Sequence, residues 1–76
     1  MKDFLNYLIS QLIDKKDSLE IEEINLSENS YQYNIKAAEV DIGKIIGKDG
    51  KIIQAVRQLA KILAVKMGLH VRIQIA

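Results

Sequence analysis

The sequence predicts an α+β domain in which a three-stranded mixed sheet carries three helices on one face. Two segments, 4–13 and 52–67, repeat apolar residues at helical spacing. Two further segments, 31–37 and 71–75, alternate apolar and polar residues as strands do. A third strand and a short helix complete the expected order of helix, strand, strand, helix, helix, strand. With 76 residues the chain is too short for two domains, so we expect one domain over residues 1–76.

The first helix is predicted from a single apolar stripe near the start of the chain. Its members recur at one-turn spacing and are Phe4, Leu5, Leu8, Ile9, Leu12 and Ile13. Asp3 is placed to cap the start of this helix. Basic residues suit a helix C-terminus, so we expect the helix to end near Lys15 or Lys16.

A hairpin is expected next. Residues 19–26 predict a strand whose apolar positions change parity at Glu22 and Glu23, which suggests a bulge there. Residues 27–30 have turn chemistry, and residues 31–37 alternate cleanly. Tyr31 and Tyr33 share one face of that second strand, and we expect them to pack in the sheet rather than to stack on bases.

The second half predicts two helices and a last strand. Ile42, Ile45 and Ile46 have helical spacing, and a long helix should run from Lys51 to about Met67, where Gly68 stops it. Its expected buried stripe is Ile52, Ile53, Val56, Leu59, Ala60, Leu63 and Met67. Because the last strand, residues 71–75, follows a helical crossover, it should lie parallel to one hairpin strand, with His70 at the surface.

Charge is distributed unevenly along the chain. Residues 1–38 hold four lysines against seven acids, whereas residues 39–76 hold seven bases against three acids. The basic half indicates a nucleic-acid partner, with an ordinary solvated helix face as the alternative. The chain has no cysteine and one histidine, so we expect no disulfide, metal or cofactor.

The sequence shows no feature of a membrane or exported protein. Its longest apolar run, residues 62–65, is far below the roughly 20 residues of a membrane-spanning helix. The first residues do not have the shape of a signal peptide. We therefore expect a cytoplasmic protein with no membrane partner.

Three glycines, Gly43, Gly47 and Gly50, lie between the two later helices. They could form a plain helix–helix turn, or they could let a phosphate approach the backbone beside Lys48 and Lys51. A phosphate loop of Walker A type is excluded because the first two glycines are one residue too close and an acid follows Lys48. The spacing also excludes a dinucleotide-binding fingerprint.

The segment Ile46–Ile53 resembles the I-G-x-x-G-x-x-I core of a KH domain, which clamps about four nucleotides of single-stranded RNA with its GxxG loop. A helix and a hairpin ahead of the loop are typical of the type II KH arrangement. The length of the chain, the order of its elements and the stretch Asp41–Lys48 extend this resemblance to the whole chain. It resembles the small bacterial single-KH-domain RNA-binding proteins of the KhpA family. This resemblance implies non-catalytic binding of single-stranded RNA, as an RNA chaperone or post-transcriptional regulator.

The resemblance also implies which residues bind RNA. Gly47 and Gly50 open the loop to the RNA backbone, and Lys48 and Asp49 are its variable pair. An apolar groove with basic residues beside it continues from the loop. The implied RNA-binding residues are Ile42, Gly43, Lys44, Ile46, Gly47, Lys48, Asp49, Gly50, Lys51, Arg57 and Arg72. The acid at Asp49 departs from the family pattern and should weaken binding without abolishing it.

The long helix carries apolar residues outside its expected buried stripe. The residues of this second face are Ala55, Gln58, Ile62 and Val65. They suggest a two-fold helix–helix contact in a homodimer, the alternative being a wider core stripe. The resemblance implies both homodimers and a complex with a larger KH-containing RNA-binding protein.

No catalytic constellation accompanies these features. All four serines precede the glycine loop, the chain has no cysteine or threonine, and no nucleophile lies in a recognisable elbow. We therefore expect no enzyme. Two alternatives to RNA binding remain open: a KH-shaped protein-interaction module with minor RNA binding, and binding of single-stranded DNA.

Overall fold

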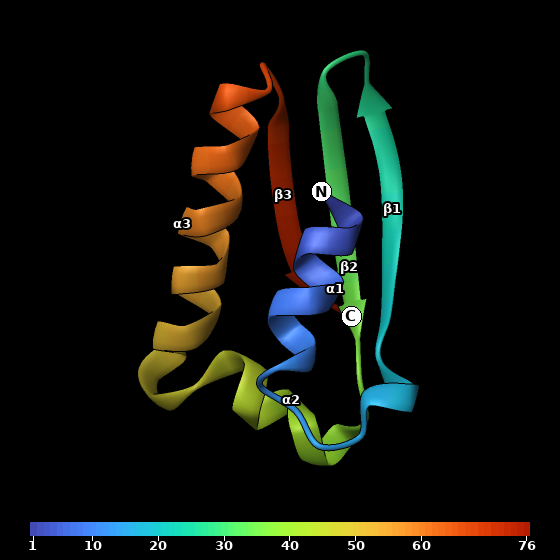
Figure 1. Cartoon of the computed structure of the whole chain (residues 1–76), viewed down its shortest axis with the longest axis vertical. Coiled ribbons are helices and arrows are strands. Elements are labelled where there is room, and N and C mark those ends of the chain that lie inside the picture. Colours follow the sequence, from blue (N-terminus) through green and yellow to red (C-terminus); the bar gives the residue numbers. More distant parts are fainter.

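The computed structural model describes all 76 residues and shows helices covering one face of a three-stranded sheet (Figure 1). The predicted class and element order are confirmed. The elements are α1 (Lys2–Ser10), β1 (Glu20–Ser27), β2 (Ser30–Lys36), α2 (Glu39–Ile46), α3 (Lys51–Lys66) and β3 (His70–Ile75), with 3₁₀ turns at Lys16–Ser18 and Lys48–Gly50. The helices lack the combination of length and hydropathy that a membrane-spanning helix needs.

The sheet is mixed, as predicted. Its strand order is β1-β2-β3, with β1 antiparallel and β3 parallel to the central strand. The predicted bulge at Glu22 and Glu23 is wrong, because pairing continues regularly past both and the irregularity lies between Asn25 and Ser27. The parity changes because Ile24 and Leu26 belong to the sheet face that carries no helix.

Helix α1 is shorter than predicted, and the predicted end near Lys15 or Lys16 is wrong. It ends at Ser10, and its N-cap is Met1 rather than the predicted Asp3. The backbone N–H groups of Asp14 and Lys15 donate to the carboxylate of Asp41 instead of to helical carbonyl oxygens. A contact distant in sequence therefore diverts the chain before the apolar stripe is complete.

The core lies between the helices and the sheet. Its buried members are Leu5, Ile9, Ile13, Ile21, Tyr33, Ile35, Ile45, Ile53, Val56, Ala60 and Ile73. Tyr33 packs there as predicted, and its hydroxyl donates to Glu23 Oε1 at 2.8 Å. Burial, followed by this hydrogen bond to a carboxylate, raises the pKa of Tyr33.

Helix α3 faces the core through a narrower stripe than predicted. Its buried residues are Ile53, Val56, Ala60 and Ala64. The prediction that Leu59 and Met67 are buried is wrong, since they are 46% and 58% exposed. The inward row is centred on the small alanines, so Leu59, about 100° around the helix from Ala60, falls outside it.

The end of α3 is as predicted. Gly68 adopts a left-handed φ of +71°. Its N–H donates to the carbonyl oxygen of Val65 at 3.1 Å, and the N–H of Leu69 donates to that of Ala64 at 2.8 Å. This pair of bonds is a Schellman motif, which turns the chain from α3 into β3.

Candidate nucleic-acid interface

The chain turns from α2 into α3 within the four residues Gly47–Gly50. Gly47 and Gly50 have φ values of +76° and +73°, and Asp49 has a φ of +58°. Glycine adopts this left-handed backbone freely, and aspartate is one of the few other residues that tolerates it. Lys48 and Asp49 are exposed at the tip of the turn.

The three glycines of this region have different surroundings. A Cβ at Gly47 would lie 2.5 Å from Cγ1 of Ile52, so Gly47 is required for packing. A Cβ at Gly43 or Gly50 would meet nothing within 4 Å. Gly43 lies inside α2, where glycine costs about 1 kcal/mol relative to alanine, and packing within the chain gives no reason for it. Open backbone at Gly43 and Gly50 is suited to close approach by a ligand.

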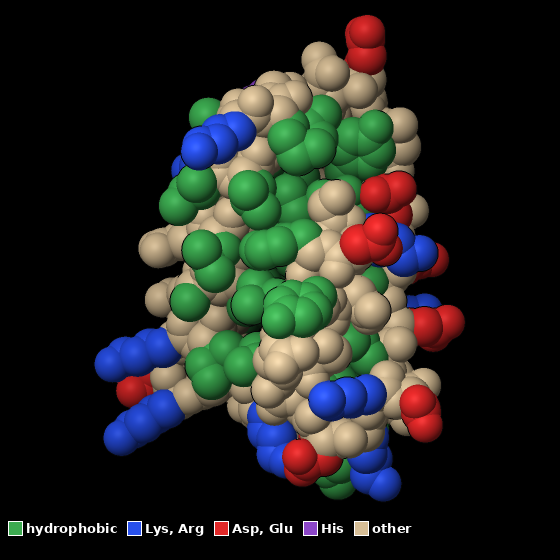
Figure 2. All heavy atoms as spheres, in the orientation of Figure 1, with side chains coloured by type: hydrophobic (Ala, Val, Ile, Leu, Met, Phe, Trp, Pro, Cys, Tyr) green, Lys and Arg blue, Asp and Glu red, His purple; other side chains and the backbone are tan.

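Positive charge collects at the same turn. Lys48 and Lys51 are exposed and form no salt bridge. Lys51 is the first residue of α3, and the N-terminal end of a helix carries a partial positive charge. The charge of the Lys51 ammonium adds to it. Figure 2 shows basic side chains extending into solvent at the end of the molecule where α2 meets α3. The turn therefore attracts anions, opposed only by the adjacent Asp49.

A second basic feature lies further along α3, at the free edge of β3. The Nε–H of Arg57 donates to the carbonyl oxygen of Ile73 at 3.1 Å. A hollow of about 380 Å³ opens there, and the residues lining it are Arg57, Lys61, Val71, Arg72, Ile73 and Gln74. Arg57 and Arg72 thus lie together, about 9 Å along α3 from Lys51 at 1.5 Å per residue.

Two polar residues that line this hollow, Lys61 and Gln74, were not among the predicted site residues. Lys61 is one helical turn after Arg57 and so lies on the same side of α3. Gln74 follows Arg72 at strand alternation. These two spacings were the available signals.

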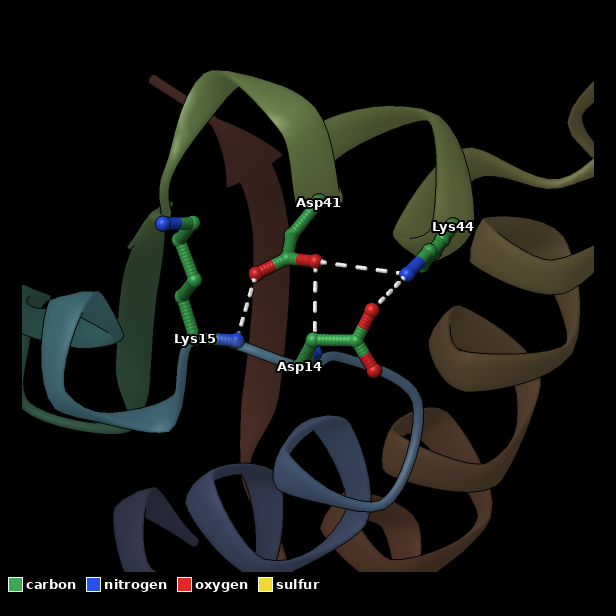
Figure 3. Close-up of polar contacts among 4 residues, drawn as sticks. All are labelled: Asp14, Lys15, Asp41 and Lys44. Carbon is green, nitrogen blue, oxygen red and sulfur yellow. Dashed lines mark hydrogen bonds and ion pairs between the residues drawn. The ribbon is translucent and has the colours of Figure 1, made fainter.

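Lys44, by contrast, is engaged within the chain (Figure 3). Its ammonium forms an ion pair with Asp14, and its Nζ lies 3.8 Å from Oδ1 of Asp41. Asp41 is the one buried charged residue and accepts the backbone N–H of Lys15 at 2.9 Å and of Asp14 at 3.2 Å. The bond from Lys15, more than any other contact, holds the pKa of Asp41 below its usual value. The bond to Asp14 raises the pKa of Lys44.

The remaining groove residues lie on α2. Ile42 is half-buried, whereas Gly43 and Ile46 are exposed. They present apolar surface and open backbone on the helix that leads into the glycine turn. The structure therefore brings α2, the turn and the start of α3 together as one surface.

The outer side of α3 is apolar. Ala55 and Gln58 are exposed, and Ile62 and Val65 are 58% and 68% exposed. Leu59 on α3 and Met67, the residue that follows α3, are also apolar and exposed. Figure 2 shows apolar side chains gathered over α3 and α1.

A family model described as "KhpA/KhpB, KH domain" matches residues 2–75. The chain belongs to this family. The RNA-binding protein KhpA of Chlamydia caviae is 39% identical over 75 residues, which cover 99% of this chain and 95% of that protein. The RNA-binding protein KhpA of Clostridium perfringens is 33% identical over 75 residues, which cover 99% of both chains. No solved structure matches the chain. The predicted KH fold and KhpA resemblance are thereby confirmed.

Proposed function

We propose that this KhpA/KhpB-family chain acts as a single KH domain over residues 1–76 and binds single-stranded RNA without a catalytic step. One observation carries the proposal: the backbone is open at Gly50 beside Lys48 and Lys51, whose charges are unpaired. The relatives that it matches over almost their whole length are named RNA-binding proteins.

The RNA backbone enters at the turn in this proposal. A phosphate contacts the N–H groups of the turn and the ammonium groups of Lys48 and Lys51. Bases lie against Ile42, Gly43 and Ile46 on α2, and Arg57 and Arg72 receive the strand at the hollow beside β3. A KH domain holds about four nucleotides, which is enough to connect these two basic features.

Affinity in this arrangement is modest and depends on salt. Two to four phosphate contacts, each with a log–log slope of about −0.7, give roughly −1.5 to −3 per protomer. Asp49 opposes phosphate at the tip of the turn and weakens binding without abolishing it. We propose that the protein acts in the cytoplasm as an RNA chaperone or post-transcriptional regulator.

The apolar side of α3 is proposed to hold a second copy of the chain. The face formed by Ala55, Gln58, Ile62 and Val65 is exposed and centred on Ile62. In a two-fold contact each copy presents the same face, so apolar residues meet apolar residues. The same face suits a larger KH-containing RNA-binding protein, which would compete with the second copy.

Crosslinking in cells tests the ligand directly. The tagged protein is crosslinked with ultraviolet light, purified under denaturing conditions and treated with RNase or DNase, and the bound nucleic acid is sequenced. We expect RNase-sensitive adducts that are lost in a Lys48→Asp variant of equal abundance. DNase-sensitive adducts would favour single-stranded DNA. The absence of adducts, with the dimer intact, would favour the protein-interaction module.

A further inference from the structure

Among the basic residues of α2, the turn and α3, Lys44 alone has its charge paired within the chain. Lys44 lies in the last turn of α2, three residues before Gly47, the first residue of the glycine turn. Its partners, Asp14 and Asp41, come from two different places in the chain (Figure 3). The charge of Lys44 is therefore not freely available to a phosphate.

The two acids hold Lys44 in different ways. Asp41 is fully buried, and both its carboxylate oxygens accept backbone N–H groups, so it is fixed in place. The side chain of Asp14 is 79% exposed, and Lys44 is the only residue with which its carboxylate forms an ion pair. Asp41 thus anchors the backbone of Asp14, and that anchoring delivers the exposed Asp14 carboxylate to Lys44.

An exposed carboxylate paired to an exposed ammonium is easily exchanged for another anion. Such pairs are worth little in water, and the side chain of Lys44 is itself 47% exposed. A backbone phosphate of RNA carries the same charge and the same kind of acceptor oxygen as Asp14. It can therefore take the place of the Asp14 carboxylate at Lys44 without disturbing Asp41.

We propose that Asp14 is an internal competitor of RNA for Lys44. Without RNA, the Asp14 carboxylate holds the Lys44 ammonium; with RNA bound, a backbone phosphate displaces it. This inference rests on the proposed RNA binding. Asp14 thereby sets the affinity below the value that the basic residues alone would give.

The test is a double-mutant cycle in the full-length protein, with Kd measured on a labelled single-stranded RNA. Asp14→Asn removes the competing charge and keeps the backbone N–H that donates to Asp41. We expect this variant to bind RNA about two- to fivefold more tightly than wild type. In a Lys44→Met background, Asp14→Asn should leave the Kd unchanged, because the Lys44 ammonium that it would free is absent.

Asp17→Asn is the matched control, since it changes the net charge equally within the same segment and Asp17 has no contact with Lys44. The control should leave Kd within the error of wild type. An equal gain in the control, or a gain that persists with Lys44→Met, overturns the inference, because either result shows a general charge effect. An Asp14→Asn variant that unfolds at a lower temperature and binds no more tightly also overturns it, because the pair is then structural. If wild type and all variants fail to bind RNA, the proposed function itself fails.

Discussion

The backbone of Gly47 lies directly against the side chain of Ile52: a Cβ at Gly47 would stand 2.5 Å from Cγ1 of Ile52. The other glycine of the turn, Gly50, has open space in the same position. The two glycines of the GxxG motif therefore serve different purposes. Gly47 lets the first turn of α3 pack against the end of α2, and Gly50 leaves the backbone accessible.

Alanine substitutions should separate these purposes. Gly50→Ala places a side chain on left-handed backbone at a cost of about 1–2 kcal/mol, so the variant should still fold. The added Cβ would stand where the phosphate approaches the backbone, so RNA binding should weaken at least about tenfold. Gly47→Ala adds the collision with Ile52 to the same backbone cost and should be clearly less stable. Thermal unfolding followed by circular dichroism, with RNA titration, checks both. Wild-type RNA affinity in Gly50→Ala would contradict the role of Gly50.

Gly43→Ala should raise stability and lower RNA affinity together. Alanine in a helix is favoured over glycine by about 1 kcal/mol, and the added Cβ meets nothing within the chain. The same Cβ would stand where we place RNA bases. Denaturant unfolding and RNA titration measure the two effects. A less stable variant would show that Gly43 serves packing instead.

Asp49→Asn should strengthen RNA binding without changing the fold. Asparagine tolerates the left-handed backbone at this position as aspartate does, and the substitution removes the one acid of the turn. The expected outcome is a lower Kd at low salt, with the unfolding temperature close to wild type. Unchanged affinity across the salt range would place the phosphates away from the tip of the turn.

Asp41 should make stability depend on pH in the acid range. Its folded pKa is lowered, so its ionised form stabilises the fold above its unfolded pKa of about 4, and this contribution is lost as pH falls through the folded pKa. Asp41→Asn should therefore unfold at a lower temperature than wild type at neutral pH. The difference should shrink progressively below about pH 4. A difference that stays constant as the pH falls would contradict a role for the ionised carboxylate.

Ile62→Lys should convert the proposed dimer into a folded monomer. Two lysines would meet across the two-fold contact, and the unfolding temperature should fall and become independent of protein concentration. Sedimentation measures the mass, with Gln11→Lys, an exposed position just after α1, as the control. An unchanged dimer mass would contradict the interface. Complete unfolding would do so too, because Ile62 would then be a core residue.

The local periodicity of apolar residues was sufficient to predict the order of helices and strands. It carries no information on contacts between residues that are distant in the sequence. The end of α1 depends on hydrogen bonds from Asp14 and Lys15 to Asp41, which is more than 20 residues away. Which residues of α3 are buried depends on where the sheet lies. The helical periodicity alone therefore could not show that Ala64 is buried and Leu59 exposed.

The candidate site was predictable to the same extent. The glycine turn and its lysines are contiguous in sequence, so a motif could indicate them. The pairing of Lys44 with Asp14 arises only when separate elements meet, and so does the hollow between α3 and β3.

In the proposed function, the glycine turn binds single-stranded RNA through its unpaired lysines. Its most direct test is a titration of labelled single-stranded RNA with wild type, Lys48→Asp and the remote control Lys2→Asp over a range of salt. We predict a log–log salt slope of roughly −1.5 to −3 for wild type and for the control. Lys48→Asp should show no measurable binding at an unchanged unfolding temperature, because the turn then carries two adjacent acids outside the core. Wild-type affinity in Lys48→Asp, or a salt slope near zero, would contradict RNA binding at the glycine turn.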